Sequence, residues 1–264
     1  MTTTIAAKDV AALRDKTGLG MMDCKKALQE NSGDIEAAEN WLREKRKGKM
    51  DTRTERTTGE GRIGIAIADD KASIVEIQTE TDFTAKTEDF IKATDDIANH
   101  ALSMPAGDVN ADETMTGLVD NLRITTGENV NFARGIRLDG GAYGSYVHHD
   151  GKRACLLQVD GEAPAEALKG ICQHIVFHDP LGIDADDVDP AALETIRNNA
   201  LAEAKESGKN DEIAEKMAEG KVRKYLEENT LMAQKYVVDE SMTISDVLPD
   251  NIKVTKFVRY TLGS

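Results

Sequence analysis

The chain has 264 residues, and its 48 Asp and Glu outnumber its 33 Lys and Arg, which gives a formal net charge of −15. This balance disfavours tight binding to nucleic acid, because neutralising phosphates requires clustered Lys and Arg. Apolar residues make up 40% of the chain but aromatic residues only 4%, so Ala-rich helices and Val/Ile strands must build several small cores. We therefore expect no direct nucleic-acid partner.

The charge is unevenly distributed along the chain. Residues 1–56 carry 12 Lys and Arg against 10 Asp and Glu, whereas the remainder carries 21 against 38. Most of the positive excess lies in Arg43–Lys49 and at Arg53 and Arg56. A short basic run of this kind favours a solvated helix end and linker over an RNA site.

Three cysteines, Cys24, Cys155 and Cys172, are too few for a disulfide framework. Reduced thiols are typical of cytoplasmic proteins. The N-terminal MTTTIAAKDV lacks the basic and apolar regions of a secretory signal, and no apolar stretch reaches 18 residues. The sequence predicts a cytoplasmic protein without a membrane span.

The first predicted elements are three short helices. Helical spacing predicts one over Ala6–Lys16 and another over Met22–Asn31, and Asp34 is placed to cap a third. Trp41 should close their small core. The arrangement resembles a ubiquitin-associated-type bundle. The polar and basic stretch Lys45–Gly61 then predicts a linker.

Two similar halves follow. Gly61–Gln78 and Gly144–Val159 each read as a hairpin, and the second hairpin contains Asp150-Gly151, which predicts a two-residue turn. The strand Lys71–Ile77 aligns with Arg153–Val159 at an offset of 82 residues, which favours an internal duplication. Each hairpin precedes a predicted helix, and a further strand is expected in the first half; these elements are Lys86–Leu102, Pro164–Phe177 and Asn129–Leu138.

The sequence QTETDFTA at Gln78–Ala85 distinguishes the first half from the second. The second half has only GEAPAE, Gly161–Glu166, between its strand and its helix, so TDFTA is not needed for the connection. A large aromatic residue such as Phe83 in a polar turn is often a wedge for a partner. The alternative is that Phe83 staples the next helix to the core.

The last part of the chain predicts a helical hairpin and a returning strand. Asp189-Pro190 marks a helix start, Ser207-Gly208 breaks the helix, and Ile213, Met217 and Leu226 mark a returning helix. The apolar stripe is thin, so the hairpin should project or pack on a second molecule, which makes homodimerisation possible. Val254–Leu262 has the composition of a strand that joins the second sheet.

These elements predict an α+β fold: a three-helix ubiquitin-associated-like bundle, then a core of two similar antiparallel-sheet/helix subdomains with an inserted helical hairpin. The expected boundaries are 1–50 for the bundle, 51–60 for the linker, 61–140 for the first subdomain, 141–189 with 229–264 for the second, and 190–228 for the hairpin.

Other candidate sites have simpler interpretations. His174 and His178 stand four residues apart near Cys172, a spacing that suits a metal. They lack an obvious third ligand, and core packing and a helix C-terminus explain them more simply. His148-His149 comes with no nucleophile motif. The segment GLGMMDCK lacks phosphate-loop spacing, so we expect neither bound GTP nor any cofactor.

Several ordered motifs together resemble those of the bacterial translation elongation factor Ts family. Beside the TDFTA stretch they are TGLGMMDCKKAL, SGDIEAAENWLREK, GENVNF, GSYVHH, IAEKMAEGKVRKY and KFVRYTLG. The resemblance implies a guanine-nucleotide exchange factor, without covalent chemistry, whose partner is elongation factor Tu in its GDP-bound and nucleotide-free states. By the same resemblance, the residues that meet this GTPase near its Mg²⁺ site are Thr81, Asp82, Phe83 and Thr84, and further contacts are Arg14, Met21, Met22, Lys25, His148 and Val237.

The chain departs from the family pattern in places. The family usually has valine where Thr84 stands, and QPFV where this chain has QKYV at Gln234–Val237. Two rival functions also stay open. One is a protein-interaction module that acts through its N-terminal bundle alone, and the other is a hydrolase that depends on a metal or on His174 or His148.

Overall fold

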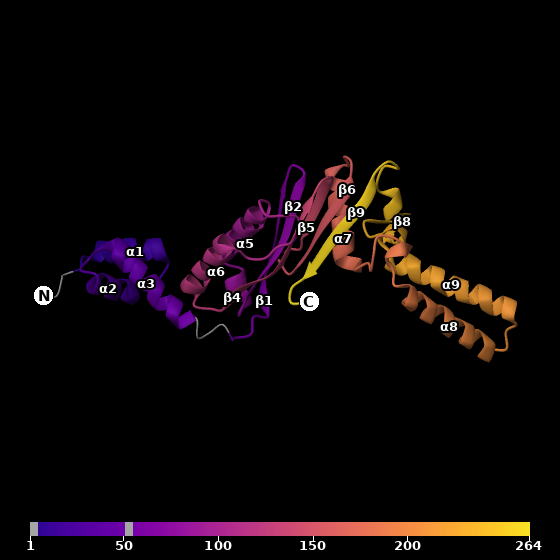
Figure 1. Ribbon diagram of the computed structural model, residues 1–264, viewed down its shortest axis with the longest axis horizontal. Helices are drawn as coiled ribbons and strands as arrows, with labels where there is room; N and C mark the ends of the chain where they lie inside the picture. Colours follow the sequence, from indigo (N-terminus) through magenta and orange to yellow (C-terminus); the bar gives the residue numbers. More distant parts are fainter. Residues whose placement is uncertain (1–4, 51–54) are drawn as a thin grey trace. The chain divides into compact units, whose positions relative to one another are not determined.

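The computed structural model describes residues 5–50 and 55–264, with side chains omitted for 47–50 (Figure 1). The described chain divides into two compact units. The first comprises the described parts of Met1–Ala66, Ser73–Arg137 and Leu262–Ser264, and the second comprises Ile67–Ala72 and Leu138–Thr261. The described chain combines N-terminal helices with antiparallel sheets and further helices, so the predicted α+β class is confirmed.

The N-terminal bundle consists of α1 (Ala7–Thr17), α2 (Met21–Glu30) and α3 (Ile35–Met50). The Asp34 carboxylate accepts a hydrogen bond from the Ala37 amide at 3.0 Å, as expected of an N-cap. Trp41 packs against the buried cluster, whose members are Val10, Leu13, Leu19, Cys24, Ala27, Leu28, Ala38 and Leu42.

The polar stretch Lys45–Gly61, predicted as a linker from its composition, begins inside α3. Residues Lys45–Met50 are helical and continue α3, because Lys, Arg and Met are good helix formers and one glycine does not end a helix. Residues 51–54 of the expected linker lie outside the described part of the chain. The first strand begins at Glu60.

The first unit contains a four-stranded sheet in the order β1-β2-β4-β3. Its strands are β1 (Glu60–Ala68), β2 (Lys71–Thr79), β3 (Gly107–Asp108) and β4 (Val130–Asp139). The helices of this part are α4 (Asp82–Ala85), α5 (Glu88–Ala101) and α6 (Glu113–Thr126). Side chains of the sheet and of α5 and α6 form one buried cluster, which includes Val75, Ile77, Phe90, Ile97 and Met115.

The second unit contains a three-stranded antiparallel sheet in the order β5-β6-β9 and a two-stranded ribbon of β7 and β8. These strands are β5 (Ala142–Val147), β6 (Arg153–Asp160), β7 (Lys235–Tyr236), β8 (Asp239–Thr243) and β9 (Lys253–Thr261). The helix α7 (Ala165–His178) packs on the sheet, and the short 3-10 turns are Ala185–Asp187, Leu231–Ala233 and Ile244–Asp246.

The turn between β5 and β6 is longer than the sequence suggested. Asp150-Gly151 lies at the bend, but the His148 amide donates to the Arg153 carbonyl at 2.8 Å, so four residues rather than two separate the paired positions. The Asp150 carboxylate accepts from the Lys152 amide at 2.9 Å, and this local bond stabilises the wider loop. The predicted strand at Val254–Leu262 does join this sheet, as β9 beside β6.

A glycine brings helix and sheet together in each half. A Cβ atom on Gly64 of β1 would lie 2.8 Å from the Thr94 side chain of α5, and one on Gly144 of β5 would lie 2.6 Å from the Leu168 Cβ atom of α7. In both halves the second hairpin strand is also flanked by a later strand, β4 or β9. The same packing device in both halves supports the inferred duplication.

The helical hairpin consists of α8 (Pro190–Glu206) and α9 (Asp211–Asn229), which lie side by side (Figure 1). Its seam is made of small side chains, since the buried residues are Ala200 and Ala204 on one helix and Ala214 and Ala218 on the other. Ile213, expected on the apolar stripe, is exposed instead. Alanine allows close approach of two helices. These small apolar side chains are therefore buried between α8 and α9 themselves.

The close approach of β5 to α7 leads to a stability prediction. Gly144→Ala should lower the free energy of unfolding by about 1–3 kcal/mol, because the new methyl group forces α7 away from the sheet. The matched change Gly117→Ala lies in α6, where a Cβ atom meets nothing within 4 Å, and should raise stability by roughly 0.5–1 kcal/mol. Urea unfolding measures both, and equal effects of the two variants would contradict the packing described.

Candidate functional site

The TDFTA sequence forms the single helical turn α4 directly after β2. Thr81 caps it: its hydroxyl accepts from the Thr84 amide at 3.3 Å, and its carbonyl accepts from the Ala85 amide at 3.2 Å. Thr84 and Ala85 point into the protein and are buried. Asp82 and Phe83 stand on the outer side of the turn, where the Asp82 carboxylate pairs with Lys86 at 2.6 Å.

The ring of Phe83 is exposed to solvent. Its fractional exposure is 81%, whereas Phe90, seven residues later, is fully buried in the core of the first unit. The staple interpretation of Phe83 is therefore wrong, because the residue that anchors this region to the core is Phe90. An exposed phenylalanine on a capped turn is a feature typical of a binding surface.

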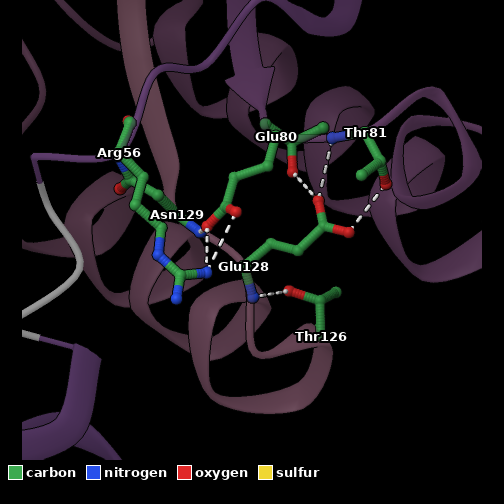
Figure 2. A network of polar contacts seen from close by, with 7 residues as sticks. Arg56, Glu80, Thr81, Thr126, Glu128 and Asn129 are labelled. Carbon is green, nitrogen blue, oxygen red and sulfur yellow. Dashed lines mark hydrogen bonds and ion pairs between the residues drawn. The ribbon is translucent and has the colours of Figure 1, made fainter.

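Glu128 supports α4 from a loop that follows α6. One carboxylate oxygen accepts from the Thr79 hydroxyl at 2.9 Å and from the Thr81 amide at 3.0 Å, and the other accepts from the Thr81 hydroxyl at 2.7 Å (Figure 2). Burial raises the pKa of Glu128, but hydrogen bonds from Thr81, Thr84 and Thr79 more than offset it, so the pKa is lowered overall. Glu128 is therefore a carboxylate at neutral pH.

Glu80 makes a second link between the same two loops. Its carboxylate accepts from the Asn129 amide at 2.7 Å and pairs with the Arg56 guanidinium at 3.1 Å. The Asn129 side chain in turn donates to the Arg56 carbonyl at 2.8 Å (Figure 2). The segments before β1, after β2 and after α6 are thus joined by polar contacts below the exposed turn.

Sequence reasoning missed Glu128, Glu80 and Arg56 as parts of this site. Glu128 lies in the GENVNF motif, one of those that resemble the elongation factor Ts family. Its bond to Thr81 spans 47 positions in the chain, and no periodicity or short motif reports such a contact. The available signal was a glutamate directly after Gly127, the glycine that ends α6.

The N-terminal residues expected to bind a partner lie on α1 and α2. Arg14 is exposed in the last turn of α1. Met21, Met22 and Lys25 are exposed on α2, and spacings of three and four residues place them on one face of that helix. The fractional exposure of Met22 is 76%. Exposed methionines beside a lysine suit an adaptable contact surface.

The remaining two expected residues, His148 and Val237, lie in the second unit. His148 is half-buried at the end of β5, where its Nδ1 atom lies 2.9 Å from the Tyr146 hydroxyl. Val237 is half-buried and Val238 exposed in the two-residue turn between β7 and β8. The structure thus assigns the ten expected residues to separate surface segments, of which α4 and α2 carry the most exposed apolar side chains.

His174 holds the turn that contains Val237. Its Nδ1 atom accepts from the Val237 amide at 3.2 Å, so its Nε2 atom carries the proton and donates to the Gln234 side-chain oxygen at 2.9 Å. The imidazole is fully buried and stacks on His178. Burial lowers the pKa of His174, a charge on His178 lowers it further, and the Gln234 bond raises it in part. Both ring nitrogens are used within the protein.

Among residues 5–50 and 55–264, no group of three His, Cys, Asp or Glu side chains is arranged to hold a metal ion. Within the same part of the chain, no helix combines the length and apolarity needed to cross a membrane.

Comparison with known proteins covers both units. A family model described as Elongation factor TS matches residues 80–264, and one described as Elongation factor Ts, mitochondrial, N-terminal matches residues 1–49. The elongation factor Ts of Brucella anthropi is 38% identical, with 98% of this chain and 93% of that protein aligned. The chain belongs to the elongation factor Ts family.

Other members of the elongation factor Ts family are similarly related. That of Dinoroseobacter shibae is 39% identical over 98% of this chain and 92% of its own, and that of Bartonella tribocorum is 35% identical over 98% and 93%. Membership makes the chain a protein of translation elongation. The match to residues 80–264 includes α4 and Glu128, and the match to residues 1–49 includes Met21 and Met22.

The different burial of two phenylalanines leads to a second prediction. Phe90→Ala should lower the free energy of unfolding by about 3–5 kcal/mol, because it empties a packed core site. Phe83→Ala should change it by less than about 0.5 kcal/mol, since the ring contacts mainly water. Chemical denaturation measures both variants. A loss for Phe83→Ala as large as that for Phe90→Ala would restore the staple interpretation.

The buried imidazole predicts a pH dependence of stability. The folded protein resists protonation of His174, whereas the unfolded chain takes up that proton below about pH 6.5. The stability that depends on neutral His174 is therefore present above pH 6.5 and is lost as the pH falls through the lower folded pKa. Unfolding at pH 7.5 and 5.5 should show this loss in the parent and in the exposed-site control His149→Gln. It should be smaller in His174→Gln, and an unchanged loss there would assign it to other groups.

Proposed function

We propose that this protein accelerates release of GDP from the GTPase elongation factor Tu. In this proposal the Phe83 ring acts as a wedge that inserts between helices of the GTPase. The observation that carries the proposal is the exposed Phe83 ring on a turn whose other residues are capped and buried. Family membership supports the choice of partner. This protein binds both the GDP-bound and the nucleotide-free form of elongation factor Tu, and it binds the nucleotide-free form more tightly.

The mechanism is an exchange of binding free energy without covalent chemistry. By linkage, a protein that prefers the empty GTPase weakens GDP binding by the same factor as GDP weakens its own binding. Bound Mg²⁺ is the largest local positive charge in such a nucleotide site. Insertion of the Phe83 ring between helices near that ion shifts them and disorders the phosphate-binding loop, so GDP loses its contacts.

Asp82 has a supporting role in this proposal. Its carboxylate lies beside Phe83 on the exposed side of α4 and is paired with Lys86. An exposed pair of this kind contributes only about 0–1 kcal/mol, so Lys86 is readily exchanged for a donor on the partner. Asp82 then brings negative charge toward the region that the Mg²⁺ ion occupies.

One wedge does not supply the whole effect. Acceleration by ~10⁴ requires ~5.5 kcal/mol of differential stabilisation, more than one phenylalanine usually contributes to an interface. Further binding free energy comes from contacts of the bundle and of the second unit. The residues are Arg14, Met21, Met22 and Lys25 on the bundle and His148 and Val237 on the second unit. We also infer a cytoplasmic location, in keeping with three buried, unpaired cysteines.

The alternative function is a protein-interaction module that acts through the N-terminal bundle alone. The exposure of Met21 and Met22 favours binding by this bundle. In that case residues 1–50 suffice for function and α4 is irrelevant to it. The exchange assay below separates the two proposals, because it depends on Phe83 only if the wedge operates.

The third test measures release of labelled GDP from purified elongation factor Tu. The parent protein should accelerate release, and Phe83→Ala should remove most of the acceleration at saturating concentration, by tenfold or more, since about 1.4 kcal/mol of lost transition-state contact is a factor of ten. Phe177→Ala is the matched control, because Phe177 is also exposed, at 73%, but lies on α7.

Three results are informative here. Full activity of Phe83→Ala excludes the wedge and leaves the bundle as the alternative. An equal loss in Phe177→Ala shows that any exposed phenylalanine affects the assay. Absence of acceleration by the parent protein excludes the exchange function itself.

A further inference from the structure

We propose that Glu128 is a positioning residue, which holds α4 in the shape that presents Phe83 to the partner. The inference concerns a residue outside α4 and rests on the proposed function for its effect on GDP release. Its structural part, that Glu128 keeps the turn folded, stands on the contacts of this chain and is tested without any partner.

The first argument is that α4 cannot support itself. It contains one turn, Asp82–Ala85, and a single helical turn fixes several backbone dihedrals for very few hydrogen bonds. Within the turn, the amides of Thr84 and Ala85 both bond to Thr81, at 3.3 and 3.2 Å. The first two hydrogen bonds of the turn therefore depend on where Thr81 is held.

The second argument is that Glu128 holds Thr81 at two points. Its carboxylate accepts from both the amide and the hydroxyl of Thr81 (Figure 2). Because the hydroxyl donates to Glu128, its lone pairs are free to accept from the Thr84 amide. A third bond, from the Thr79 hydroxyl, ties the carboxylate to the end of β2. Glu128 thereby fixes the angle between a rigid strand and the exposed turn.

The third argument concerns charge. Among the described residues, Glu128 forms no ion pair, and its hydrogen-bond donors are neutral groups of Thr79, Thr81 and Thr84. Glu80, which precedes Thr81, instead pairs with Arg56. Hydrogen bonds to a carboxylate are stronger than those to a neutral acceptor and cost more when lost. A carboxylate satisfied by neutral donors of one turn is suited to holding that turn.

The geometry also separates holding from binding. Met21, Met22 and Lys25 belong to α2, and His148 and Val237 to loops of the second unit, whereas the groups that donate to Glu128 belong to Thr79, Thr81 and Thr84 at the end of β2 and in α4. Loosening α4 therefore lowers only the fraction of molecules in which Phe83 is ready to insert. The maximal rate of GDP release should fall, while the concentration that gives half of that rate should change little.

The test compares Glu128→Gln with Glu113→Gln, which makes the same charge change at an exposed position of α6. Amide hydrogen exchange is measured first, on each full-length protein alone. In Glu128→Gln the amides of Thr84, Ala85 and Lys86 should exchange their hydrogens at least about tenfold faster than in the parent. The reason is that loss of one charge-assisted hydrogen bond changes an opening equilibrium by at least about that factor. Protection within α5 should not change, and Glu113→Gln should match the parent throughout.

GDP release from elongation factor Tu is measured second. Glu128→Gln should reduce the maximal rate several-fold and shift the half-saturating concentration by less than about twofold, because the other contacts remain. Thr81→Val removes the hydroxyl from the other side of the same bond and should reproduce both effects. It also serves as the second variant if Glu128→Gln does not fold.

Unchanged amide exchange in α4 of Glu128→Gln overturns the proposal. The proposal is also overturned if Glu128→Gln loosens α4 but keeps the parent's maximal rate of GDP release, while Phe83→Ala loses that activity. If the parent protein does not accelerate GDP release from elongation factor Tu, the proposed function fails. Amide exchange alone then supports or overturns the proposal that Glu128 holds α4.

Discussion

The hydrogen bonds between Glu128 and Thr81 are the contact on which the exposed turn α4 depends. Exposing a large aromatic ring gains nothing for the folded protein, because burial and not exposure of apolar surface stabilises a fold. The turn that carries Phe83 is also too short to be stable alone. The turn is held from outside by the Glu128 carboxylate, and its own Thr84 and Ala85 are buried in the protein.

The two halves of the core show how such a turn is added to an existing scaffold. Both use a glycine at the same place to bring helix against sheet, and both flank the second hairpin strand with a later strand. In the second half the chain enters α7 after a short loop, whereas in the first half α4 stands between β2 and α5. The scaffold is complete without α4, which frees the sequence of that turn for binding.

Polar contacts from buried or half-buried side chains hold surface turns in both units. In the first unit Glu128 and Glu80 connect the turn after β2 with the loop after α6. In the second unit the His174 ring holds the β7–β8 turn through the Val237 amide and the Gln234 side chain. In both cases a side chain of limited solvent access binds backbone amides of an exposed turn, which fixes the turn without occupying its outer face.

The sequence by itself determined the elements and the candidate wedge. Period and turn residues predicted the three N-terminal helices, the paired hairpins, the helical hairpin and the last strand, because these patterns reflect local geometry. The comparison of two similar halves singled out Phe83 as a residue that the connection does not need. The same local reasoning misjudged the start of the linker and the length of the β5–β6 turn, where good helix formers and an aspartate side chain decided the outcome.

Only the tertiary structure decided which side chains of the candidate site are exposed and which residues they contact. From the sequence Phe83 was equally suited to stapling a helix, whereas in the structure Phe83 is exposed and Phe90 fills the core. Glu128 meets Thr81 across 47 positions, and His174 meets Val237 across 63. Contacts at such separations depend on how sheets and helices pack, and local periodicity in the sequence does not predict them. The physical reason is that burial and hydrogen bonding are properties of neighbours in space, which the chain acquires only when it folds.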